Sequence, residues 1–121
     1  MSHLIYLASP YSHPDPEVEK YRYETVCKVA GELMARGFHV YSPIAHSRAI
    51  AIASEFPHDF NFWEATDRDM ITRCDSVYVL MLPGWEDSQG VQAEIQIAKE
   101  LGKPFGTLKE ENEGNTVLLD T

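Results

Sequence analysis

The sequence predicts a three-layer α/β domain with a mostly parallel sheet of four to five strands. Short apolar runs alternate with amphipathic helical patterns along the chain. The apolar run at 76–82 also lacks the polar alternation of a half-exposed strand, as expected for a strand covered on both faces. Strands that alternate with helices give a sheet between two helical layers. At 121 residues, we expect 1–121 to form a single domain.

The first third of the chain has the pattern of a strand, a helix and a second strand. The apolar residues 4–8 are the first strand. A helical pattern begins near Pro16 and closes at Gly37, which suits a proline in the first turn and a glycine just after the last. The run 38–42 is the second strand. This order gives a right-handed crossover unit.

The remainder continues the alternation. A loop is expected over 55–61, and the charged segment 109–115 is expected to be loose. Residues 116–119 are expected to add an edge strand or an interface segment. The other expected elements are a short helix, a longer helix, a buried strand, a helix and a fourth strand, over 45–54, 60–73, 76–82, 88–101 and 105–108.

Composition and charge argue against several kinds of partner. A net charge of −9 disfavours a nucleic acid or an anionic membrane as the main partner. No apolar run approaches the roughly 20 residues of a membrane span, and the N-terminal residues lack the pattern of a signal peptide. The isolated Cys27 and Cys74 fit free thiols and show no metal-ligand spacing. We therefore expect a cytoplasmic protein.

Polar residues follow each of the first three expected strands, at the edge where a parallel sheet binds ligands. Glu94 is the candidate catalytic group, because Val91 and Ile95 mark the buried face beside it and Gly90 leaves room for a ligand. A solvated helix charge is the alternative interpretation of Glu94. The other candidates at this edge are Tyr6, Ser9, Pro10, Tyr11, Ser42, Pro43, His46, Trp85, Asp87 and Ser88.

Structural interpretations compete with these functional ones. Ser88 fits a helix N-cap, a role compatible with phosphate binding at the same helix end. Tyr6 could fill the core, His46 could lie on the surface or in the core, and Trp85 could be an exposed loop aromatic. Asp67 and Asp69 precede the buried strand, where a second carboxylate near Glu94 would allow acid–base chemistry at a glycosidic carbon.

Three short motifs follow one another in a recognisable order: IYLASPY at 5–11, DRDMI at 67–71 with CDS at 74–76, and DSQGVQAE at 87–94. With these motifs the chain resembles, over about residues 4–108, the nucleoside 2-deoxyribosyltransferase superfamily. Within it, the chain is similar to the small domains of unknown function of the DUF1937-like branch. The resemblance implies a Rossmann- or flavodoxin-like fold and a relationship to nucleoside 5′-monophosphate N-glycosidases.

The resemblance also implies roles for individual residues. Glu94 corresponds to the nucleophile, Asp69 to the aspartate that assists at the base and sugar, and Tyr6 to the tyrosine that holds the nucleophile. Ser88 stands where the nucleotide N-hydrolases have a serine that contacts the 5′-phosphate, and where the nucleoside-specific transferases have an aspartate. The neighbouring Asp87 leaves a nucleoside substrate open.

The implied activity is cleavage of the N-glycosidic bond of a nucleoside or nucleoside 5′-monophosphate, through a glycosyl-enzyme ester and without a cofactor or metal. We favour hydrolysis over base exchange. The loop at 10–13 lacks the arginine that the related hydrolases carry after the first strand, and this difference argues against a 5′-phosphate on the substrate. A nucleotide-binding module without turnover is the alternative from another class. A homodimer or homotetramer is expected, with the tail 116–121 as a candidate contributor to a neighbouring pocket.

Overall fold

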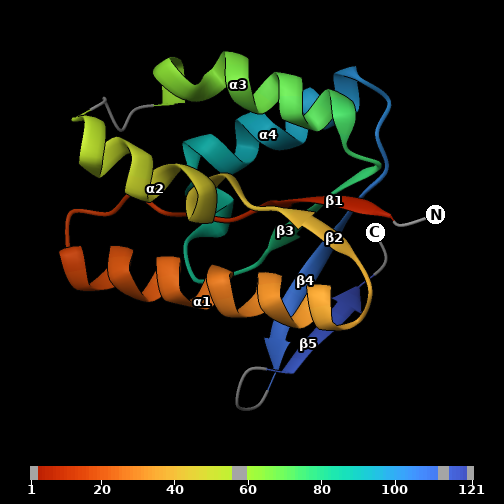
Figure 1. Ribbon diagram of the computed structural model, residues 1–121, viewed down its shortest axis with the longest axis horizontal. Coiled ribbons are helices and arrows are strands. Elements are labelled where there is room, and N and C mark those ends of the chain that lie inside the picture. The colour runs from red at the N-terminus through yellow and green to blue at the C-terminus, as the bar shows by residue number, and fades with distance from the viewer. Residues whose placement is uncertain (1–2, 56–59, 112–114, 120–121) are drawn as a thin grey trace.

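The computed structural model describes residues 3–55, 60–111 and 115–119, and in these residues it forms one sheet between layers of helices (Figure 1). The strands are β1 (Leu4–Ala8), β2 (His39–Tyr41), β3 (Ser76–Leu80), β4 (Phe105–Glu111) and β5 (Asn115–Leu119). The helices are α1 (Pro16–Ala35), α2 (Pro43–Ser54), α3 (Phe60–Arg73) and α4 (Gln89–Glu100), with a single 3₁₀ turn, η1 (Trp85–Asp87), before α4.

The sheet is mostly parallel, as the sequence predicts. Its described strands lie in the order β2-β1-β3-β4-β5. Strand β1 pairs in parallel with both β2 and β3, so that Tyr6 lies opposite Tyr41 on one side and Val77 on the other. Strand β4 is parallel to β3, whereas β5 is antiparallel to β4. The flavodoxin-like order of the first four strands confirms the expected fold class.

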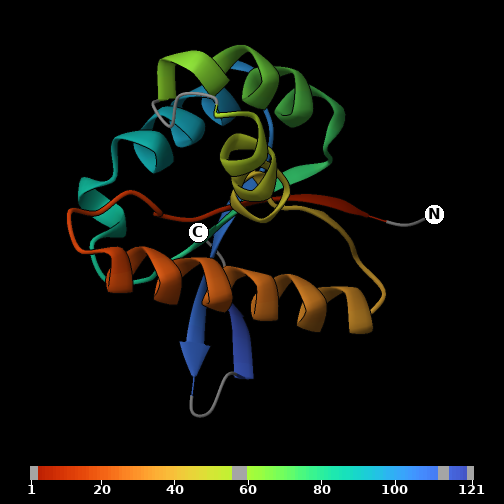
Figure 2. The same ribbon diagram turned by 60° about the vertical axis from the view of Figure 1, so that its left-hand side comes forward.

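The expectation of a loose segment over 109–115 is wrong for residues 109–111, which belong to β4, and for residue 115, which begins β5. Strand β4 continues through these charged residues because β5 pairs with them, placing Lys109 opposite Val117. Pairing with a neighbouring strand satisfies backbone groups whatever the side-chain charge. Together β4 and β5 extend past α1, away from the other helices (Figures 1 and 2). Residues 112–114 of the expected loose segment, and 56–59 of the expected loop, lie outside the described residues.

The two faces of the sheet carry separate hydrophobic clusters. Helix α1 covers one face and packs residues such as Val29 and Leu33 against Leu7 and Leu80. Helices α3 and α4 cover the other face (Figure 2), where the buried cluster consists of Tyr6, Ala8, Ile71, Cys74, Val77, Val79, Val91, Ile97 and Ala98. Strand β1 contributes to both clusters through alternate residues, which explains why its sequence is apolar throughout.

Side-chain caps fix where the helices begin. The Asp15 side chain accepts a hydrogen bond from the amide of Glu17 at the start of α1. Ser42 caps α2 in the same way, so this helix begins at Pro43 rather than at the expected residue 45. Ser88 caps α4 by accepting from the amide of Val91, which confirms the expected cap.

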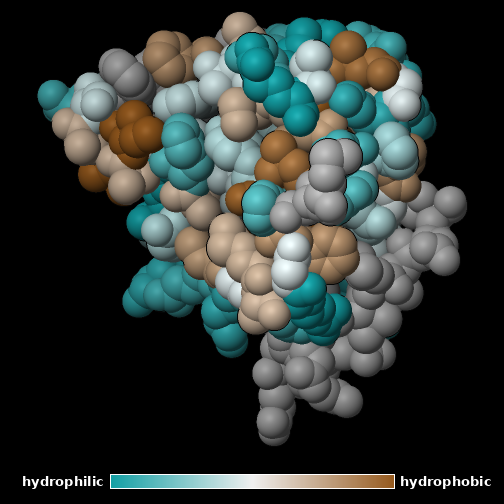
Figure 3. Space-filling model, turned by 45° about the vertical axis from the view of Figure 1, so that its right-hand side comes forward, coloured by the Kyte–Doolittle hydropathy of each residue, from teal (hydrophilic) through white to brown (hydrophobic). Residues whose placement is uncertain are grey.

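The surface of the described chain carries scattered apolar side chains. On the face shown in Figure 3 the most hydrophobic residues form separate small groups among hydrophilic ones. No helix within the described ranges is both long enough and apolar enough to cross a bilayer. Both cysteines, Cys27 and Cys74, are free thiols, and Cys74 is buried.

Candidate functional site

A cavity of about 360 Å³ opens at the carboxyl ends of β1 and β3. This is the point where the chain order of the sheet reverses, since β2 lies on one side of β1 and β3 on the other. The volume falls within the usual range of roughly 300–1,000 Å³ for small-molecule sites. The cavity is lined by Ser9, Tyr11, Ser12, Pro43, Ile44, Ser47, Arg48, Ala51, Trp63, Asp67, Asp87, Ser88, Gln89, Gly90 and Glu94.

Glu94 is a buried carboxyl group on the wall of this cavity. Only 5% of the residue is exposed, because it lies on the face of α4 that packs against the sheet. The hydroxyl group of Tyr6, which is fully buried in β1, donates a hydrogen bond to Oε2 of Glu94. Burial raises the pKa of Glu94 to about 8; the Tyr6 hydrogen bond lowers it and the nearby Asp67 raises it.

Asp67 is the second buried carboxyl group of the site. It lies on α3, is 6% exposed and lines the same cavity. Burial raises its pKa to about 6, and interaction with the Tyr6 hydroxyl opposes that shift. The pKa of Tyr6 itself lies well above its ordinary value, because of burial first and of Glu94 and Asp67 next. Two carboxyl groups and one phenol therefore form an electrostatically linked group.

A second tyrosine borders this group from the next strand. The ring of Tyr41 on β2 lies 5.6 Å from that of Tyr6, between centroids. Burial, followed by the negative charge of Asp67, raises the pKa of Tyr41 to about 12. Its hydroxyl is buried and has no hydrogen-bond partner within the described part of the chain. Tyr41 therefore remains a neutral phenol beside the carboxyl groups.

The structure does not bring Asp69, the expected partner of Glu94, to the cavity. Its side chain is 60% exposed and forms an ion pair with Arg73, with 3.3 Å between Nε and Oδ1. Two residues along a helix correspond to about 200°, so Asp67 and Asp69 must face nearly opposite directions. Asp67 shares its face of α3 with Trp63 and the buried Ile71, four residues before and after it, and this spacing is the signal that would have selected it.

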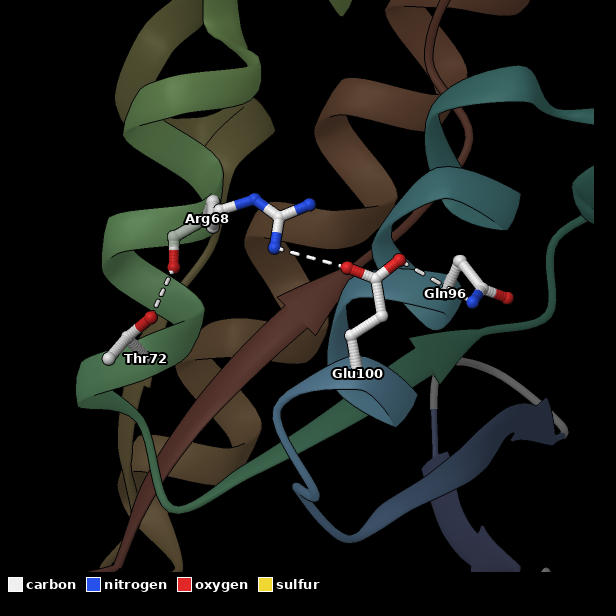
Figure 4. A network of polar contacts seen from close by, with 4 residues as sticks. All are labelled: Arg68, Thr72, Gln96 and Glu100. Carbon is white, nitrogen blue, oxygen red and sulfur yellow. Dashed lines mark hydrogen bonds and ion pairs between the residues drawn. The ribbon is translucent and has the colours of Figure 1, made fainter.

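Between these two aspartates, Arg68 connects α3 to α4 on the outside of the molecule. Its Nη1 lies 3.2 Å from Oε1 of Glu100, and Gln96 donates to the other carboxylate oxygen at 3.5 Å (Figure 4). The Thr72 hydroxyl donates to the main-chain oxygen of Arg68. These exposed contacts contribute little stability, but they join the two helices that carry Asp67 and Glu94.

The other expected site residues divide into two groups. Ser9 and Tyr11 line the cavity after β1, and Asp87, Ser88 and Gly90 line it at the start of α4. Three further residues, Pro10, Trp85 and His46, do not line it. Pro10 is buried, and Trp85 packs against the hydrophobic cluster beneath α3 and α4. His46 lies in a separate shallow depression, 5.3 Å from the ring of Tyr41 between centroids.

Sequence reasoning identified only one residue of α2 that lines the cavity, the expected Pro43, and missed the rest of this helix. One face of this helix lines the cavity through Ile44, Ser47, Arg48 and Ala51. Their spacing of three, one and three residues marks a single helical face, on which a serine and an arginine replace the apolar residues of a core-facing stripe. That mixed composition is the signal in the sequence. Trp63 at the start of α3 was also missed, although it lies one turn before Asp67.

Arg22 joins two loops beside the cavity. The residue is buried, and among the described residues its guanidinium group donates to main-chain oxygens: Nη1 donates to the oxygens of Ser12 at 2.9 Å and Tyr11 at 3.4 Å. Its Nη2 donates to the oxygen of Pro83 at 3.0 Å. Gly84 has a φ of +90°, and a Cβ there would lie 2.8 Å from Nη2 of Arg22. Arg22 thus holds the loop after β1 against the loop after β3.

Comparisons with known proteins agree with this architecture. The family model of DUF1937, a domain of unknown function, matches residues 3–110. A solved structure of 2-deoxyribosyltransferase from the psychrotolerant bacterium Bacillus psychrosaccharolyticus is similar to this chain, with 25% sequence identity and a TM-score of 0.59. The similarity covers 91% of this chain and 74% of that one. No curated protein matches the sequence. Within the described residues, no group of three or more His, Cys, Asp or Glu side chains is placed to hold a metal ion.

Proposed function

The chain belongs to the DUF1937 family, and we propose that it cleaves the N-glycosidic bond of a nucleoside or nucleoside 5′-monophosphate. The buried Glu94, hydrogen-bonded by Tyr6 on the wall of the cavity, is the observation that carries the proposal. Burying a carboxyl group is costly, and here a hydrogen bond fixes its orientation toward a space large enough for a ligand. Similarity to a 2-deoxyribosyltransferase supports glycosyl transfer as the class of reaction.

In the proposed reaction Glu94 is the nucleophile. Its carboxylate oxygen bonds to C1′ of the sugar while the bond from C1′ to the base nitrogen breaks, and that electron pair stays on the base. Asp67 donates a proton to the departing base. Water then bonds to C1′, the ester bond to Glu94 breaks, and Asp67 accepts a proton from the water. Asp67 takes this role instead of Asp69, because Asp67 lines the cavity and Asp69 faces solvent.

The protonation of the two carboxyl groups suits this chemistry. With a pKa of about 8 for Glu94 and about 6 for Asp67, the pair holds one proton near neutral pH. The first step needs one ionised carboxylate to attack and one proton for the base. A pair of carboxyl groups that shares one proton supplies both. In the free protein burial keeps this proton mainly on Glu94, so we propose that the proton moves from Glu94 to Asp67 when substrate binds.

Tyr6 is a positioning residue in this proposal. Its hydroxyl group has one proton, which it donates to Oε2 of Glu94. Because its own pKa is raised well above 10, Tyr6 keeps this proton and remains a donor throughout the working pH range. A fixed donor restricts rotation of the Glu94 carboxyl and lowers its pKa, and both effects favour attack by the other oxygen.

Base exchange is the second candidate, and the similarity to a 2-deoxyribosyltransferase favours it specifically. The chemistry of the first step is unchanged. A second base, rather than water, would then accept the sugar from the Glu94 ester. The two candidates differ in what occupies the space vacated by the first base, so an added acceptor separates them.

The experiment is base release, followed by chromatography, from deoxyribonucleosides and their 5′-monophosphates with and without an added acceptor base. Release without acceptor supports the hydrolase, and release only with acceptor supports the transferase. A ribonucleoside arm tests whether the 2′-hydroxyl is tolerated. Absence of release under every condition, with retained binding of the same compounds, would instead favour a nucleotide-binding module.

A further inference from the structure

Arg48 is the one cation among the described residues that line the cavity. It stands out because the chain carries a net charge of −9 and the remaining ionisable residues of the lining, apart from Tyr11, are carboxylic acids. A guanidinium group is charged at every physiological pH. Its presence in the wall therefore gives this part of the cavity a permanent positive charge.

Two aromatic residues hold the Arg48 side chain in place. Its Nε donates a hydrogen bond to the Tyr11 hydroxyl at 3.1 Å, and Tyr11 also lines the cavity. The guanidinium carbon lies 4.4 Å from the ring centroid of Tyr23 on α1, a cation–π distance. Fixing an arginine in advance lowers the entropy lost when it binds a ligand. The side chain is thus ordered before any ligand arrives.

These contacts leave the outer nitrogen atoms of Arg48 available. Neither Nη1 nor Nη2 forms a hydrogen bond with any of the described residues, and no carboxylate among them lies within ion-pair distance of Arg48. Arg22, Arg68 and Arg73 behave differently: both Nη atoms of Arg22 donate to main-chain oxygens, and Arg68 and Arg73 pair with carboxylates. The planar pair of Nη donors matches two oxygens of a phosphate group.

Further donors surround the same space. Ser9 is 5% exposed and lines the cavity, and its Oγ has no hydrogen-bond partner within the described residues. A buried hydroxyl without a protein partner is free to donate a hydrogen bond to a ligand in the cavity. Gln89 and Gly90, the first two residues of the 12-residue helix α4, also line the cavity. The amides of a first helical turn have no acceptor within the helix and attract anions.

We propose that Arg48 is the specificity residue for an anionic substituent, so that the preferred substrate is a nucleoside carrying a phosphate monoester on its sugar. The proposal rests on the proposed function for the identity of the nucleoside, but the anion subsite itself depends only on Arg48, Ser9 and the start of α4. Arg48 binds the phosphate oxygens, whereas Asp67 and Glu94 face the glycosidic bond.

Asp87 opposes this preference. Its exposed carboxylate lines the same cavity and repels a phosphate group. Removing one or the other of these two charges should therefore have opposite effects on the binding of a phosphate group. Arg48→Gln should weaken binding of a nucleoside monophosphate, and Asp87→Asn should strengthen it, while neither should change binding of the uncharged nucleoside by a comparable factor.

Binding is measured by calorimetry in the full chain carrying Glu94→Gln, to prevent turnover. The ligands are a deoxyribonucleoside, its 5′-monophosphate and its 3′-monophosphate. We expect one monophosphate to bind about 10- to 100-fold more tightly than the nucleoside, and Arg48→Gln to abolish that advantage. Arg48→Lys should restore part of it, since the charge returns without the planar donors. Arg36→Gln, which removes a surface arginine paired with Glu32, should leave it unchanged.

Equal affinity for the nucleoside and both monophosphates would overturn the proposal, as would an advantage that survives Arg48→Gln in a protein with unchanged circular dichroism. Base release by the wild type separates this result from failure of the proposed function. A phosphate preference that depends on Arg48, without base release, supports the subsite and rejects the enzyme. Base release at equal rates from nucleosides and monophosphates supports the enzyme and rejects the subsite.

Discussion

The Tyr6 hydroxyl donates a hydrogen bond to Oε2 of Glu94 and so connects β1 to α4 across 88 positions of the chain. Both residues are buried beneath a cavity to which Glu94 has access. The pair is therefore at once part of the core and part of the candidate site. Substitutions that keep the shape of either residue test its chemistry without opening a hole in the core.

Tyr6→Phe removes only the hydroxyl group. Losing a hydrogen bond to a charged acceptor should lower kcat by about 10- to 100-fold, with a smaller effect on KM. Because that bond lowers the pKa of Glu94, its loss should also raise the pKa that Glu94 contributes to the rate profile. Steady-state kinetics across pH measures both effects. Tyr78→Phe on β3, which packs against the opposite hydrophobic cluster, is the matched control.

Asp67→Asn and Asp69→Asn form a matched pair on α3. Loss of the proposed acid should lower kcat by about 100- to 10,000-fold, whereas removal of the exposed Asp69 should leave kcat within about twofold of the wild type. A substrate whose leaving base needs no protonation should recover much of the activity of Asp67→Asn. The assignment of Asp67 is incorrect if Asp69→Asn proves the more damaging of the two.

The rate should depend on pH through the carboxyl pair. If the reactive form holds one proton, kcat/KM should rise near pH 6 and fall near pH 8, matching the pKa values of about 6 for Asp67 and about 8 for Glu94. These values belong to the free protein, so kcat/KM rather than kcat is the quantity to follow. A rate that is flat between pH 5 and 9 would exclude this pair from the first step.

Stability should fall as pH rises through the same range. Glu94 has a pKa of about 8 when folded against 4.5 as an ordinary carboxyl, so above pH 4.5 the unfolded chain releases a proton that the folded protein keeps. The free energy of unfolding should therefore decrease by a few kcal/mol between about pH 5 and 8. Urea unfolding of Glu94→Gln at several pH values should show a much smaller decrease. If the free energy of unfolding of this variant depended on pH as strongly as that of the wild type, the buried state of Glu94 would be contradicted.

The contact between Arg22 and the loop at Gly84 should matter for stability. Gly84→Ala places a Cβ at a φ of +90° and 2.8 Å from Nη2 of Arg22, and it should destabilise the protein by about 1–3 kcal/mol. Gly31→Ala is the control, and its effect on stability should be opposite. Gly31 lies within helix α1, and nothing lies within 4 Å of a Cβ added there. There the change should stabilise by about 0.5–1 kcal/mol. Urea midpoints measure both, and a neutral Gly84→Ala would show that the loop adapts freely.

Much of the fold could be predicted because the apolar pattern and the helix caps agree with each other. The strand at 76–80 is apolar on both faces, and Ser88 precedes a clear helical stripe that includes Val91. The extent of β4 could not be predicted, since Lys109 is held in the strand by pairing with β5 and not by its own preference.

The candidate site was predictable only in part. Tyr6 and Glu94 lie inside a strand and a helix that the apolar pattern identifies, and both occupy buried faces of these elements, so their meeting follows from the packing of α4 on the sheet. Asp67 and Arg48 depend on which way a helix is rotated, and the sequence motif alone pointed to Asp69. Comparing each charged residue with the apolar stripe of its own helix would have selected Asp67 over Asp69 and would have identified Arg48.

The most direct test of the central claim is to trap the sugar on Glu94. A 2′-deoxy-2′-fluoroarabinosyl nucleoside, with its 5′-monophosphate as a second arm, slows both steps because fluorine disfavours the oxocarbenium-like transition state. Intact mass spectrometry and peptide mapping then locate any ester. We expect one glycosyl adduct on the peptide containing Glu94 in the wild type, and none in Glu94→Gln. Continued release of base with no adduct, or an adduct on another residue, would contradict the account.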